Sequence, residues 1–381
     1  MDAIVSRQTL DRLKRGVPPV HAIDELSVGM RSLRKKLDVL LAPDASPRWF
    51  YVTSEYGEGK SHFHCYAKHY ALERGYAVAS LDVNGDDGAL NHPQRHFALI
   101  LDSIRSSLKK FEHCQGFAEI VRTFMEQEDP ESVVSLLSGA YSEDPYTAAG
   151  TDPNRLWGYL WHMQQDDQPF VRSRYFSELL RYLSGQDLIN KSWYGRFAVA
   201  YRLQLVQRIL RDTGHQGLLL FVDEIDNVVR QIGTRGHPAC FRTLAWYCSA
   251  PVYPAVRVIF ASTPEVIEML DSWGRSNYGR EIRSQKTVRP EEVRTFNQWS
   301  REAEEQAGQG WHSCPKLTAA QRVELFHRIA GIHSQAWGCE RRLKQSFVER
   351  LAKQPEYATP RRWVRTVVRI LDLLEQNGLP E

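Results

Sequence analysis

The chain reads Ser54-Glu55-Tyr56-Gly57-Glu58-Gly59-Lys60-Ser61 directly after the compact aromatic and β-branched run at 49–53. Such a run is typical of a buried strand, and the residues from Lys60 onward are typical of a helix. Gly57 and Gly59 permit the dihedrals that aim successive backbone N–H groups at one point, and a helix N-terminus behind them attracts anions. The spacing predicts a phosphate-binding loop in which Lys60 reaches the β and γ phosphates and the Ser61 hydroxyl ligates Mg²⁺. Ser54 stands where the usual pattern begins with glycine.

The segments that follow the loop predict a parallel sheet. We expect the helix that begins at Lys60 to end at Gly75, and residues 76–83 to form a second strand. A strand, a helix and a strand joined by a short return form a βαβ unit, which implies a parallel sheet covered by helices. The runs at 218–222 and 256–261 lack polar alternation, as buried parallel strands do. The sequence therefore predicts an α/β fold.

Carboxylates come directly after the most strand-like run of the chain. Asp223 and Glu224 follow five apolar residues, which places them at the C-terminal tip of a central strand. Ligands of open α/β sheets bind at such tips. We expect Asp223 to hold Mg²⁺ through its water shell and Glu224 to polarise the attacking water. Taken without the phosphate loop, the same residues are equally well explained as a solvated strand end.

The next strand ends in the polar residues Ser262 and Thr263. A hydroxyl at this tip can position water and respond to hydrolysis at the γ-phosphate. We predict this role for Thr263, with Ser262 as the alternative. The competing interpretation is a hydroxyl turn that starts the following helix.

Two arginines near the C-terminus follow a predicted helix start. Thr359 suits the cap and Pro360 the first turn, so Arg361 and Arg362 lie at the helix N-terminus. Phosphoryl transfer gains from an arginine near the γ-phosphate, and we expect one of this pair to fold back over the nucleotide. A solvated helix start explains them equally well. Arg280 and Arg283 are weaker candidates.

The histidines and the cysteine just after the loop do not predict a zinc site. His62 and His69 share one face of the expected helix, whereas His64 and Cys65 turn away from it. No second pair of ligands stands at a spacing typical of zinc-binding modules.

Composition limits the class of protein more than it identifies it. The chain has 381 residues and a formal net charge of +3, which neither requires nor excludes nucleic acid. The six cysteines show no paired spacing, and the N-terminus has no apolar core of a signal peptide. No run of about 18 apolar residues occurs. We expect a cytoplasmic protein without a membrane span.

The chain length suggests two or three packed units. We predict an N-terminal helical segment over 1–47, with helices at 9–15 and 30–41, and a core over 48–290. The stretch from 97 to 213 is largely helical and longer than a crossover needs, so we expect a helical insertion at about 112–195. Residues 291–381 should be helical to the end.

With these motifs placed, the chain resembles AAA+-type ATPases of the Orc/Cdc6 kind, and more closely the BREX-system ATP-binding proteins (BrxD-like). The similarity begins at the Leu-Lys-Arg-Gly-Val-Pro-Pro stretch over 13–19 and continues through the loop at 55–63. The blocks at 75–79, 214–218, 223–224 and 261–265 also match in order. The stretch from about 112 to 193 carries no matching block.

The resemblance implies a five-stranded AAA+-like core with a C-terminal helical lid, and ATP and Mg²⁺ as cofactors. It also implies ATP-dependent work on DNA, directly or through a helicase or methylase partner, in bacterial defence against phage. An ATP-dependent homo-oligomer is a further expectation. The residues expected to line the nucleotide are Glu55, Tyr56, Gly57, Glu58, Gly59, Lys60, Ser61 and His62.

Three functions compete at this point. The first is an active ATPase, and the second is a nucleotide-gated scaffold with little turnover. The third is a small-molecule kinase, which fits the phosphate loop but not the paired carboxylates with a helical C-terminal region.

Overall fold

A computed structural model describes residues 2–127, 195–249, 253–264, 290–308, 312–314, 316–338 and 343–377. The chain divides into two compact units. The first unit comprises Met1–Pro43, Val52–Tyr70 and Trp311–Glu381, and the second comprises Asp44–Tyr51 and Ala71–Gly310.

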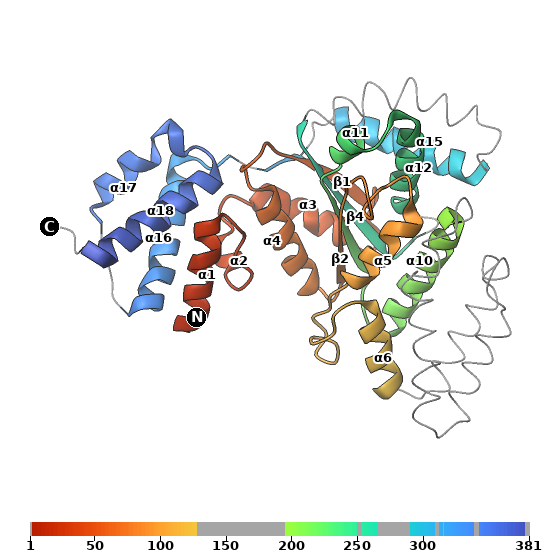
Figure 1. The fold of residues 1–381 in the computed structure, drawn as a ribbon, viewed down its shortest axis with the longest axis horizontal. Coiled ribbons are helices and arrows are strands. Elements are labelled where there is room, and N and C mark those ends of the chain that lie inside the picture. Colours follow the sequence, from red (N-terminus) through yellow and green to blue (C-terminus); the bar gives the residue numbers. More distant parts are fainter. Residues whose placement is uncertain are drawn as a thin grey trace. The chain divides into compact units, whose positions relative to one another are not determined.

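A five-stranded sheet with helices around it forms the α/β part of the molecule (Figure 1). The sequence pattern predicted the α/β class, and the family resemblance implied the five strands. Its strand order is β2-β3-β4-β1-β5, and the pairings of β2 with β3, β3 with β4 and β1 with β5 are parallel. The strands are β1 (Trp49–Thr53), β2 (Ala77–Asp82), β3 (Leu218–Asp223), β4 (Val256–Ser262) and β5 (His312–Ser313). All residues of β1, β3 and β4 are buried, which explains their continuous apolar runs.

One sequence expectation about the sheet was wrong. The chain after Pro290 was expected to be helical throughout, but His312 and Ser313 pair in parallel with Val52 and Thr53 as β5. A strand of two residues, both polar, is too short to show any periodicity.

The second unit contains most of the sheet and the helices that flank it. Helix α5 packs on β2 and against α10, and α12 packs against α15. The helices are α5 (Pro93–Asp102), α6 (Phe117–Gln127), α10 (Gly195–Asp212), α11 (Asn227–Gln231), α12 (His237–Tyr247) and α15 (Pro290–Gly308). Most of the predicted insertion at 112–195 lies outside the described residues.

The first unit joins both ends of the chain. Helix α1 packs against α16 and α18 (Figure 1). Their apolar faces share one core that includes Leu10, Ile329 and Trp363. The helices of this unit are α1 (Ala3–Arg15), α2 (Ile23–Leu26), α3 (Arg31–Leu41), α4 (Lys60–Leu72), α16 (Ala319–Trp337), α17 (Gln345–Ala352) and α18 (Pro360–Asn377). Helix α1 begins at Ala3 rather than at Thr9, because the Asp2 side chain caps it by accepting from the amide of Val5.

Among the described helices, none combines the length and the apolar character that a membrane crossing would need.

Candidate functional site

The loop after β1 has the backbone that the sequence predicted. Gly57 and Gly59 have φ values of 84° and 112°, in a region of backbone conformation that residues with a Cβ rarely adopt. The amide of Glu58 donates to the Glu55 carbonyl at 3.2 Å, which closes a tight turn. Helix α4 begins at Lys60, and its first-turn hydrogen bond runs from the Phe63 amide to the Gly59 carbonyl at 2.8 Å. A glycine turn that leads directly into a helix N-terminus is a backbone site for anions.

Side chains of the loop hold this turn in place. The Glu58 carboxylate accepts from the Glu55 amide at 3.1 Å and lies 3.3 Å from the ammonium of Lys316. Ser54 is buried, and its hydroxyl donates to the Glu55 carbonyl at 3.3 Å. The serine at the position of the usual glycine therefore takes part in the turn.

Lys60 and Ser61, the candidate phosphate and metal ligands of the loop, lie at the start of α4. The Lys60 ammonium lies 5.7 Å from the centre of the Tyr56 ring, and that ring is 67% exposed. Ser61 is exposed, and within the described residues its hydroxyl makes no hydrogen bond. Mg²⁺ prefers oxygen ligands such as hydroxyls and carboxylates, so Ser61 and Asp223 are of the right type for this ion.

The two C-terminal arginines have different surroundings in the structure. The Arg361 amide donates to the Gly57 carbonyl at 3.2 Å, which places the N-terminus of α18 on the phosphate loop. The Arg361 side chain lies over Gly16, where an added Cβ would come within 2.7 Å of its Nε. Arg362 instead lines a hollow on the surface of the first unit. Of the two candidates that the sequence left open, Arg361 is the one beside the loop.

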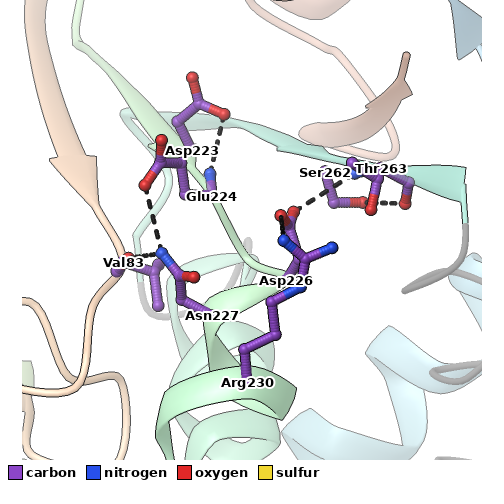
Figure 2. A network of polar contacts seen from close by, with 8 residues as sticks. All are labelled: Val83, Asp223, Glu224, Asp226, Asn227, Arg230, Ser262 and Thr263. Atoms are coloured by element: carbon purple, nitrogen blue, oxygen red, sulfur yellow. Dashed lines mark hydrogen bonds and ion pairs between the residues drawn. The ribbon is translucent and has the colours of Figure 1, made fainter. Parts of the chain in front are cut away.

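The carboxylate pair stands at the end of β3 (Figure 2). Glu224 has φ of 57°, and among the described residues it is the one non-glycine residue with positive φ. Its amide donates to the Asp223 carboxylate at 2.8 Å, and Asn227 Nδ2 donates to the Glu224 carboxylate at 3.2 Å and to the Val83 carbonyl at 2.7 Å. Strained backbone conformations of this kind occur mainly at functional sites.

A buried carboxylate, Asp226, connects the end of β3 with the end of β4. It accepts from the Thr263 amide at 3.3 Å and lies 3.8 Å from the Arg230 guanidinium (Figure 2). The sequence alone indicates no role for Asp226 or Asn227. Both lie directly after the carboxylate pair, but only the fold shows what they contact.

The two hydroxyls at the tip of β4 differ in their partners. The Ser262 hydroxyl donates to the Thr263 carbonyl at 3.1 Å, whereas the buried Thr263 hydroxyl has no hydrogen-bond partner among the described residues. A buried polar atom without a partner costs free energy and often marks a functional position. The role of Thr263, with Ser262 as the alternative, stays a prediction.

The histidines of α4 have structural contacts. His62 Nε2 lies 2.9 Å from the Ser27 hydroxyl, and His69 Nε2 lies 2.7 Å from the Asp24 carboxylate. Burial lowers the pKa of His62 to about 4, so its ring is neutral at physiological pH. Within the described part of the chain, His62, His64 and Cys65 belong to no group of three converging ligands. Arg280 and Arg283 lie outside the described residues.

No curated protein matches the chain. No solved structure matches it either. A family model matches residues 2–139 and 191–379, which include the phosphate loop, the carboxylate pair, Thr263 and Arg361. Because these two segments make up most of the sequence, the chain belongs to the family of BREX system ATP-binding proteins BrxC/D.

Proposed function

We propose that this chain binds ATP with Mg²⁺ at the phosphate loop and hydrolyses it with the carboxylates at the end of β3. The observation that carries the proposal is the loop itself. Gly57 and Gly59 both have positive φ, and the N-terminus of α4 follows immediately. An ATP-binding family supports the choice of nucleotide.

Each residue has a distinct task in this proposal. The loop amides and Lys60 hold the phosphates, and the Ser61 hydroxyl and Asp223 are the side chains that would hold the metal. Mg²⁺, when bound, neutralises charge on the β and γ phosphates. Glu224 orients and polarises the attacking water. Thr263, whose buried hydroxyl lacks a partner among the described residues, donates to that water or to the γ-phosphate.

Arg361 is the proposed cation that the C-terminal helices contribute. Its amide already contacts Gly57, so its guanidinium can approach a bound phosphate without any change in the position of the helix start. In this view the C-terminal helices act as an AAA+-type lid. The strand order, in which β4 lies between β1 and β3, supports an AAA+-like core.

The work that hydrolysis performs is proposed from the family. A BREX component acts with other parts of a defence system. We propose that the ATP cycle drives assembly or remodelling on DNA, or on a helicase or methylase partner. A homo-oligomer that forms with ATP and a cytoplasmic location belong to the same proposal.

A second candidate function is a nucleotide-gated scaffold that binds ATP with little turnover. The observation in its favour is the hydrogen bond from Asn227 to Glu224, because a carboxylate held in this way must be released before it can orient water. Tight ATP binding with turnover near zero, unchanged by DNA, would favour the scaffold.

The binding half of the proposal is tested by Lys60→Ala. Loss of a charge-assisted contact costs about 1.5–3 kcal/mol, so the dissociation constant for MgATP should rise roughly tenfold to 100-fold. Titration calorimetry measures this constant directly. Lys109→Ala is the matched control, because it removes an exposed lysine from the second unit and should leave the affinity unchanged. Equal affinity of Lys60→Ala and the wild type would contradict the assignment of the loop.

A further inference from the structure

A basic hollow lies on the surface of the first unit, and none of the residues that line it has a task in the proposed ATP site. It has a volume of about 570 Å³ and is lined by helix α18, by the end of α1 and by the turn before α18. The cations of its lining are Lys14, Arg362, Arg365 and Arg369, and its carboxylates are Glu356 and Asp372. We call this feature the arginine hollow.

The charges of the arginine hollow do not cancel. The Lys14 ammonium lies 3.0 Å from Asp372, so these two groups compensate each other. Arg362, Arg365 and Arg369 are exposed, and in the described ranges none of them forms an ion pair or a hydrogen bond. Three guanidinium groups are thus opposed by one further carboxylate, that of Glu356.

The spacing of the arginines matches an extended anion better than a compact one. Arg362, Arg365 and Arg369 stand at positions i, i+3 and i+7 of α18, which places them on one face of the helix. With a rise of about 1.5 Å per residue, the row spans roughly 10 Å. A single phosphate group is smaller than this row, whereas successive phosphates of a polynucleotide can meet each guanidinium in turn. Guanidinium forks match phosphate oxygens in geometry and remain charged at any physiological pH.

We propose that the arginine hollow binds the phosphate backbone of double-stranded DNA, without reading its sequence. The inference rests on the DNA-directed part of the proposed function and names the surface that makes the contact. Phosphate contacts are favoured over base stacking because the aromatic ring of the lining, Tyr357, lies 6.4 Å from the ring of Trp363 and is partly covered.

The test is the double variant Arg365→Ala/Arg369→Ala in the full chain. Affinity for a short random-sequence duplex is measured by fluorescence anisotropy over a series of salt concentrations. Each lost phosphate contact lowers the slope of log K against log salt by about 0.9, so the slope should fall by about 2. At moderate salt the dissociation constant should rise roughly tenfold. Alanine favours helix, so α18 should persist, which circular dichroism checks.

Two matched variants make the result specific. Arg350→Ala/Lys353→Ala removes two exposed cations of the same helical bundle that do not line the hollow, and it should bind DNA like the wild type. Arg365→Lys/Arg369→Lys keeps the charges and should retain most of the salt slope.

Several outcomes would overturn the proposal. They are an unchanged slope in the alanine variant, an equal loss in the control variant, and a wild type that binds polyglutamate but not duplex DNA. ATP turnover of the same preparations is measured in parallel. If the alanine variant hydrolyses ATP at the wild-type rate and also binds DNA like the wild type, the role of the arginine hollow is rejected and the proposed ATPase is not. If the wild type shows no ATP turnover, the proposed ATPase is contradicted, whereas the comparison of DNA binding between the variants remains valid.

Discussion

At the scale of single residues, the candidate site depends on backbone conformations that most side chains do not tolerate. Gly57 and Gly59 have positive φ in the phosphate loop, and Glu224 has positive φ despite its side chain. A non-glycine residue in such a conformation costs on the order of 1–3 kcal/mol. Glu224 bears this cost. Its side chain is held by a hydrogen bond from Asn227, and its amide is held by a hydrogen bond to the Asp223 carboxylate.

The substitution Gly59→Ala tests the effect of the backbone conformation of the loop without adding a steric clash. No atom lies within 4 Å of a Cβ added at Gly59, so the substitution acts through φ of 112° and not through a clash. We expect the affinity for MgATP to fall about tenfold or more, because the loop must leave the conformation that aims its amides at the phosphates.

Gly233→Ala is the control for this experiment. Gly233 also has free space around a Cβ, but its φ is −62°, which alanine adopts readily. Its MgATP affinity should equal that of the wild type. If Gly59→Ala bound MgATP as tightly as Gly233→Ala, positive φ at residue 59 would not matter for the nucleotide.

The contiguous parts of the candidate site can be picked out from the sequence residue by residue. Lys60, Ser61 and the two glycines stand next to one another in sequence, so their spacing alone defines a loop. Asp223 and Glu224 were predictable because five apolar residues precede them. The choice between Arg361 and Arg362, and the contacts of Asp226 and Asn227, depend on which distant segments pack together. No local pattern encodes that information.

At the scale of helices and strands, the four longer strands were predicted to within one residue at each end. Their burial on both faces produces continuous apolar runs, which are a strong signal. The fifth strand and the first turns of α1 were missed. One is two residues long, and the other is set by the cap at Asp2.

A buried histidine connects two of the helices beside the sheet. His96 of α5 is fully buried, with its Nδ1 3.0 Å from the Ala89 carbonyl and its Nε2 2.5 Å from the Tyr247 hydroxyl of α12. Burial lowers the pKa of His96 to about 4. The unfolded chain, with an ordinary histidine pKa near 6.5, therefore takes up this proton first as the pH falls.

The sign of the pH effect follows from that order. Stability from His96 is present above pH of about 6.5 and is lost as the pH falls towards 4. Between about pH 7.5 and 5, the free energy of unfolding should decrease by roughly 2 kcal/mol through this group. Urea unfolding at both pH values measures the change. In His96→Gln the decrease should be smaller by that amount, and an equal decrease in both proteins would contradict the account.

At the scale of the whole chain, the packing of the two ends is the least predictable feature. Helix α1 shares a core with α16 and α18, more than 300 residues away in sequence, and Ser6 is hydrogen-bonded to Gln335. Each of these helices shows an apolar face, but periodicity does not say which face meets which. The boundaries 1–47, 48–290 and 291–381 therefore stay a prediction about domains.

The central claim is that one bound ATP is hydrolysed through Glu224, and Glu224→Gln tests it most directly. Glutamine keeps the size of the side chain but removes the charge that polarises water. ATP turnover and MgATP affinity are measured on the same preparation of the full chain, next to the wild type. We expect turnover to fall by about 10²–10⁴, the usual contribution of a general base, while the affinity stays within about twofold. Turnover of Glu224→Gln at the wild-type rate would contradict the claim.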